Sequence, residues 1–151
     1  MINDVVEFNK RRNQLKWDLD LELKMLREEI REFWEAETIA ERVDAFVDTE
    51  YVWFGTKVKA SYNTIALHKD LTKSVEDSLT LMQEYLFKEL NSKVWEVIEN
   101  ARKIVCKANA LKGSKLDKDG KVLKDEAYKE AIDATKQIAL MIEEVTKPRS
   151  Y

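Results

Sequence analysis

The scarcity of residues that break helices constrains the fold of this chain more than any other feature. Its 151 residues include only three glycines, Gly55, Gly113 and Gly120, and one proline, Pro148. A β fold of this length would need many tight turns, and tight turns draw heavily on glycine and proline. The sequence therefore predicts an all-α fold, and the length suits a single domain, residues 1–151, with a core of its own.

Apolar residues recur every three to four positions along most of the chain, which is the spacing of a buried helix face. This spacing predicts an amphipathic helix over residues 2–14 and a longer helix over residues 18–37. Thr38, followed three residues later by Glu41, fits a capping box and predicts that a third helix starts there. The second and third helices would fold back on each other as an antiparallel hairpin, around which a helical bundle is built.

The second half of the chain continues this pattern with two interruptions. Residues 57–70 are less periodic and could either continue the third helix or break it. Helical spacing returns over residues 71–111, where a bend is allowed near Asn91. Glycines and lysines predict a basic loop over residues 113–124, and a last helix is expected over residues 126–145.

Charge and hydropathy exclude several classes of protein. Charged residues make up 36% of the chain, yet the net charge is only −3, which gives no electrostatic reason to bind a nucleic-acid polymer or an anionic membrane. The sequence has no apolar run typical of a transmembrane helix or a signal peptide. The one cysteine, Cys106, cannot form an intrachain disulfide. We therefore expect a soluble, cytoplasmic protein that binds neither nucleic-acid polymers nor membranes.

Two acidic clusters about a dozen residues apart are the most informative feature for function. The first consists of Glu28, Glu29 and Glu32, and the second of Glu41, Asp44 and Asp48. Residues three or four apart share a helix face, so the predicted hairpin would direct both clusters to one point. Carboxylates held so close repel one another unless a cation neutralises them, which favours a hard divalent ion. The sequence therefore predicts an Mg²⁺ site, and such sites commonly serve phosphate chemistry.

Simpler interpretations of these carboxylates stay open. Acidic residues at helical spacing usually lie on a solvated face, and Glu41 could merely complete the capping box. Against the first interpretation, neither Asp44 nor Asp48 has a basic residue four positions downstream that would compensate its charge. Glu50 falls inside the apolar stripe of the third helix and is either a paired core carboxylate, within the chain or across a subunit interface, or a further ligand.

Two short motifs contain most of these carboxylates. Glu29-Ile30-Arg31-Glu32 is an E-x-x-E motif, and Glu41-Arg42-Val43-Asp44 is an E-x-x-D motif. The chain continues with Ala45-Phe46-Val47-Asp48, Tyr51 and Gly55-Thr56. A second segment, residues 105–124, contains Asn109, Lys115 and the turn Asp119-Gly120-Lys121.

In these motifs the chain resembles the MazG-like group of all-α nucleoside triphosphate pyrophosphatases, especially the phage and bacterial members similar to phosphoribosyl-ATP pyrophosphohydrolase. The resemblance covers about residues 8–124. The link between the two motifs is shorter than is usual in that family. Glu41 and Asp48 are therefore both candidates for the fourth metal ligand.

The resemblance implies Mg²⁺-dependent hydrolysis of a nucleoside triphosphate between the α and β phosphates, which gives the monophosphate and pyrophosphate. It implies a homodimer or a homotetramer. The residues that it implies are Glu29, Glu32, Asp44 and Asp48 as metal ligands, Glu28 or Glu41 as the catalytic base, and Asn109, Lys112, Lys115 and Lys121 as substrate-binding residues.

Two alternatives remain at the level of sequence. Phosphoribosyl-ATP hydrolysis uses the same chemistry on a related fold, and only substrate assays separate the two activities. A non-catalytic helical interaction module would have no metal affinity. A ferritin-like di-iron bundle is disfavoured because its Glu-x-x-His pairs are absent and His68 is the one histidine.

Overall fold

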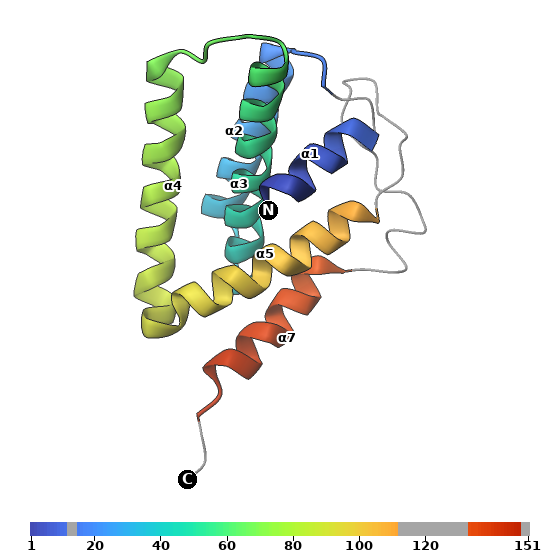
Figure 1. Cartoon of the computed structure of the whole chain (residues 1–151). Helices are drawn as coiled ribbons and strands as arrows, with labels where there is room; N and C mark the ends of the chain where they lie inside the picture. The colour runs from blue at the N-terminus through green and yellow to red at the C-terminus, as the bar shows by residue number, and fades with distance from the viewer. Residues whose placement is uncertain (12–14, 112–132, 149–151) are drawn as a thin grey trace.

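A computed structural model describes residues 1–11, 15–111 and 133–148 of the chain. All regular structure in these ranges is helical, which confirms the all-α prediction (Figure 1). The elements are α1 (Ile2–Arg11), α2 (Leu19–Glu35), α3 (Ile39–Tyr62), α4 (Lys69–Leu90), the short 3-10 turn η1 (Asn91–Lys93), α5 (Val94–Ala110) and α7 (Ala134–Thr146). Within the same ranges, no helix combines the length and the apolar character needed to cross a lipid bilayer.

Side-chain caps start α2 and α3 at the predicted residues. The backbone N–H of Leu21 donates to Oδ1 of Asp18 at 3.1 Å. The N–H of Glu41 donates to Oγ1 of Thr38 at 3.2 Å, and the Thr38 hydroxyl donates to Oε1 of Glu41 at 3.0 Å. Each cap satisfies a helix-terminal N–H that has no partner within its helix. α2 ends at Glu35, slightly earlier than predicted, so that only residues 36–38 connect it to α3.

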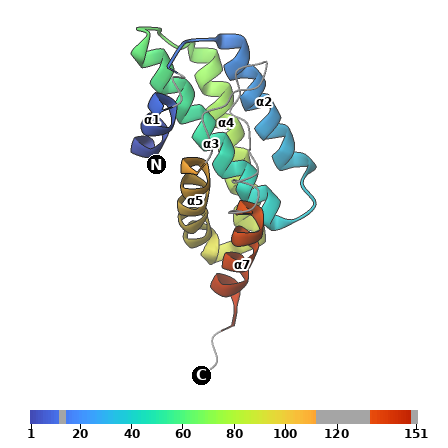
Figure 2. The same ribbon diagram turned by 90° about the vertical axis from the view of Figure 1, so that its right-hand side faces the viewer.

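α3 is the central helix of the fold. It contacts α1, α2, α4, α5 and α7, which surround it in Figure 2. Most residues of α3 are therefore buried or half-buried, and Glu41 near its start and Lys57, Ser61 and Tyr62 near its end are exposed. In the main core, Val43, Phe46 and Val47 of α3 pack with side chains of the surrounding helices, namely Phe33, Met82, Leu86, Ile98 and Ile138. Trp53 of α3 packs with Leu26 and Val75 in a second cluster.

Residues 57–70, which the sequence left undecided, first continue the third helix and then break it. α3 continues to Tyr62, and the chain then breaks until α4 begins at Lys69. The Asn63 side chain supports this break, because its Nδ2 donates to the carbonyls of Lys59 at 2.8 Å and Leu15 at 2.6 Å.

Asn91 confirms the bend that the sequence allowed, whereas the start of the last helix differs from the prediction. The helical region 71–111 is divided at Asn91, whose φ of 51° ends α4 and turns the chain into α5. The last helix does not run continuously from residue 126, because Asp133 is extended (φ −98°, ψ 96°) and caps a helix that starts at Ala134. The predicted loop over residues 113–124 lies outside the described residues.

Candidate active site

One pocket gathers carboxylates from both acidic clusters. It has a volume of about 320 Å³, and its lining includes Glu32, Glu35, Glu41 and Asp44. Ala36, Ala45 and Thr135 complete the lining, so no basic side chain belongs to it among the described residues. The pocket is therefore strongly acidic.

The connection between α2 and α3 creates this pocket. Glu32 and Glu35 share a face of the last turn of α2, while Glu41 and Asp44 share a face of the first turns of α3. Because only residues 36–38 separate the two helices, these faces meet at the connection. The first turn of α7 lies beside the beginning of α3 and contributes Thr135 (Figure 2).

Among the described residues, neither Arg31 nor Arg42 lines this pocket. Nε of Arg31 lies 3.8 Å from Oε2 of Glu35, but both side chains are well exposed, and such surface pairs are weak. Arg42, the basic residue within the second motif, is directed toward α4. Its Nη1 lies 3.8 Å from Oε1 of Glu89, and its guanidinium carbon lies 5.1 Å from the centre of the Tyr85 ring.

Of the other predicted residues that the structure describes, Glu28, Glu29, Asp48 and Asn109 do not line this pocket. Glu28 and Glu29 lie one turn earlier on α2 and are half-buried, and the Oε2 atom of Glu29 is shielded from solvent. Asp48 lies one turn further along α3 and is also half-buried. Asn109 is buried near the end of α5. Lys112, Lys115 and Lys121 lie outside the described residues.

The donor set suits a hard cation, although the described residues form no complete metal cage. In the part of the chain that the structure describes, no three acidic, histidine or cysteine side chains form a group that could hold a metal ion. Mg²⁺ does not require such a cage, because it usually retains several waters and binds one or two carboxylates together with substrate phosphates. The all-oxygen lining from Glu32, Glu41 and Asp44 fits an ion that binds in this way.

Glu50 is a core carboxylate that is paired within the chain. It is 6% exposed, and Arg102 of α5 donates from Nε to its Oε1 at 3.0 Å and from Nη2 to its Oε2 at 2.7 Å. Arg102 also binds Glu99. The hydrogen bond to Glu50 raises the pKa of Arg102, so the guanidinium stays charged. Of the interpretations that the sequence allowed, the structure supports pairing within the chain.

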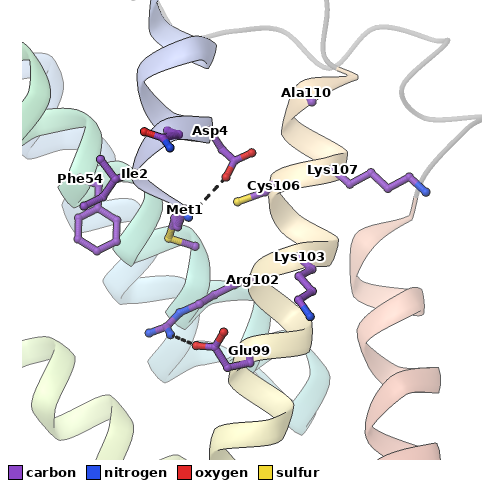
Figure 3. Close-up of a pocket in the computed structure, with 11 residues that line it drawn as sticks. Met1, Ile2, Asp4, Phe54, Glu99, Arg102, Lys103, Cys106, Lys107 and Ala110 are labelled. Carbon is purple, nitrogen blue, oxygen red and sulfur yellow. Dashed lines mark hydrogen bonds and ion pairs between the residues drawn. The ribbon is translucent and has the colours of Figure 1, made fainter.

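A second, larger pocket lies between α1 and α5 and shares no residue with the acidic pocket (Figure 3). Its volume is about 820 Å³, and its lining includes Asp4, Phe54, Arg102 and Cys106. In Figure 3 the side chain of Lys107 extends away from α1. Both carboxylates of its lining are paired, Asp4 with the N-terminal ammonium and Glu99 with Arg102, so the lining is not dominated by acidic groups.

Cys106 in this second pocket is expected to react slowly with thiol reagents. Burial, with a smaller contribution from Asp4, raises the pKa of its thiol from 9.0 to about 11. At pH 8 the folded chain would then carry about 100-fold less thiolate than an ordinary cysteine, and the thiolate is the reactive form. Alkylation rates with iodoacetamide at pH 8 should rise by a similar factor when the chain is unfolded in urea. Equal rates in the folded and unfolded chains would contradict the raised pKa.

Comparison with known proteins identifies no relative of this chain. No protein-family model matches it, and neither a curated protein nor a solved structure matches it. Function must therefore be argued from the site residues and from the motifs.

Proposed function

We propose that this chain is an Mg²⁺-dependent nucleoside triphosphate pyrophosphohydrolase that converts a ribo- or deoxyribonucleoside triphosphate into the monophosphate and pyrophosphate. The observation that carries the proposal is the pocket at the α2–α3 connection. There Glu32 of the E-x-x-E motif lies with Glu41 and Asp44 of the E-x-x-D motif, and none of the described residues that line the pocket is basic. The motifs suggest the reaction, and the grouping of carboxylates from both motifs in one pocket supports it.

The carboxylates of the pocket divide into two roles. Glu32 and Asp44, from different helices, would hold the Mg²⁺ ion. When bound, the ion would neutralise the triphosphate and make a water nucleophilic at neutral pH. Glu29 and Asp48, the other two ligands that the motifs suggest, lie one turn further along α2 and α3 and do not join Glu32 and Asp44 in one ligand group in this structure.

Glu41 is the better placed of the two candidates for the catalytic base. It lines the pocket, whereas Glu28 does not. A base must come within hydrogen-bond distance of the water whose proton it accepts, so membership of the pocket is the first requirement. The hydrogen bond from Thr38 to Oε1 of Glu41 restrains the side chain near the connection. The capping role and the catalytic role are therefore compatible in one residue.

We assign the remaining contacts to the substrate to the last turn of α5 and to the residues that follow it. We propose that Lys112, Lys115 and Lys121 bind phosphate oxygens as point charges and that Asn109 contacts the sugar or the base. We further propose a homodimer or homotetramer. Several large apolar side chains are half exposed in the single subunit, which favours contact with a partner subunit. They include Trp34, Leu81, Phe87 and Trp95.

The test is pyrophosphate release from a panel of ribo- and deoxyribonucleoside triphosphates, with phosphoribosyl-ATP included, in the presence of Mg²⁺ or of EDTA. We expect release that requires Mg²⁺, and the preferred member of the panel identifies the substrate. Preference for phosphoribosyl-ATP would indicate the biosynthetic activity. No release from any compound, together with no change in melting temperature on addition of Mg²⁺, would contradict the proposal and indicate a helical interaction module.

A further inference from the structure

The first turn of α7 forms part of the acidic pocket, although it belongs to neither acidic cluster. Thr135 lines the pocket, and its Oγ1 atom lies 3.1 Å from Oδ2 of Asp44. An ionised carboxylate can only accept hydrogen bonds, so the threonine hydroxyl is the donor. The two residues are 91 positions apart in the chain, and only the folded packing of α7 brings them together.

Thr135 is held in position from both sides. Before it, Asp133 caps α7 by accepting a hydrogen bond from the N–H of Lys136 at 3.0 Å. After it, Ile138 is fully buried, and Ile142 is nearly so, in the main core against α3 and α5. A hydroxyl on a turn fixed by a cap and by core side chains has a defined position relative to α3. Thr135 can therefore set the orientation of the Asp44 carboxylate.

We propose that Thr135 is a positioning residue of the acidic pocket, which fixes the plane of the Asp44 carboxylate for a divalent cation. This inference rests on the proposed function of the pocket. Hydrogen-bond partners of metal-binding side chains typically change metal affinity or activity by about 10- to 100-fold. The pocket is then incomplete without α7, and the C-terminal helix is a functional part of the site.

The experiment compares Thr135→Val, which removes the hydroxyl at nearly constant shape, with Thr135→Ser, which keeps it. Thr146→Val is the matched control, since that hydroxyl lies at the other end of α7 and donates to the carbonyl of Ile142 at 2.6 Å. Binding of Mn²⁺, followed by electron paramagnetic resonance, is measured alongside the Mg²⁺ dependence of pyrophosphate release. We expect Thr135→Val to weaken Mn²⁺ binding by about 10-fold or more, with wild-type binding in the serine and control variants.

The outcomes separate this inference from the proposed function. Wild-type pyrophosphate release together with unchanged Mn²⁺ binding in Thr135→Val would overturn the positioning role and leave the function standing. Suppose instead that the wild-type chain binds Mn²⁺ but releases no pyrophosphate, and that Thr135→Val binds Mn²⁺ more weakly than the wild type. That result would support the positioning role and overturn the function. A wild-type chain that neither binds Mn²⁺ nor releases pyrophosphate would overturn both. Melting temperatures of all three variants show whether any loss reflects unfolding.

Discussion

Replacing Glu32 by glutamine or Asp44 by asparagine is expected to lower Mg²⁺-dependent pyrophosphate release by about 1000-fold or more. Each change keeps the shape of the side chain and removes its negative charge from the pocket. A metal ion contributes several kcal/mol of transition-state stabilisation, and about 4 kcal/mol corresponds to a factor of about 1000. The measurement is kcat/KM for the preferred substrate at saturating Mg²⁺, beside the melting temperature of each variant.

Glu37→Gln is the matched control for these two variants. Glu37 is an exposed carboxylate in the α2–α3 connection, yet it does not line the pocket. Its replacement should leave kcat/KM at the wild-type value, because the long-range field of an exposed charge is screened by salt. If the control lost as much activity as Asp44→Asn, the loss would reflect general charge at the connection, and the assignment of Asp44 as a ligand would be wrong.

Comparing Glu41→Gln with Asp48→Asn addresses the ambiguity that the short link between the motifs creates. Glu41 lines the pocket with Asp44, whereas Asp48 lies one turn away. A base that accepts a proton contributes about 100- to 10,000-fold to the rate, so glutamine at Glu41 should reduce kcat more than asparagine at Asp48 does. The motif spacing does not distinguish Glu41 from Asp48, whereas their positions relative to the pocket do.

Local signals in the sequence were sufficient for much of the fold. Asp18 and Thr38 mark helix starts because a cap depends only on residues within the next turn. The acidic faces of α2 and α3 follow from helical spacing alone, and Glu35, which lies three positions after Glu32, could have been included on the same ground. The break at Asn63 was not predictable, because it depends on a hydrogen bond to Leu15, a distant position in the chain.

The features that the sequence did not reveal are those formed by distant pairs. Glu50 stands out in an apolar stripe, but nothing near it in sequence indicates Arg102, which lies 52 positions later. Thr135 gives no local sign that it contacts Asp44. Glu22 resembles an ordinary surface residue of a charged helix, yet it is 1% exposed because Lys59 and Thr56 surround its carboxylate. Helical spacing predicts faces, whereas the partner of each face depends on packing.

The buried pair of Glu22 and Lys59 leads to the largest expected change in stability. Nζ of Lys59 lies 2.9 Å from Oε2 of Glu22, and the Thr56 hydroxyl lies 2.9 Å from Oε1. The Lys59 residue is 5% exposed, so Glu22→Gln would leave its ammonium buried without a compensating charge. Removing one partner of a buried pair typically costs about 3 to 5 kcal/mol. In a domain of this size that corresponds to a fall in melting temperature of roughly 10 °C or more.

Two comparisons decide whether the loss comes from the buried charge. Asp77→Asn removes one partner of the fully solvated pair formed with Lys73 on α4, and it should leave the melting temperature nearly unchanged, since water screens such pairs. The double variant Glu22→Leu with Lys59→Met removes both buried charges. It should recover most of the stability that Glu22→Gln loses, because replacing a buried pair by apolar side chains is often neutral or stabilising. If the double variant remained as unstable as Glu22→Gln, the pair itself would stabilise α2 against α3, and its attraction would exceed the cost of removing both charges from water.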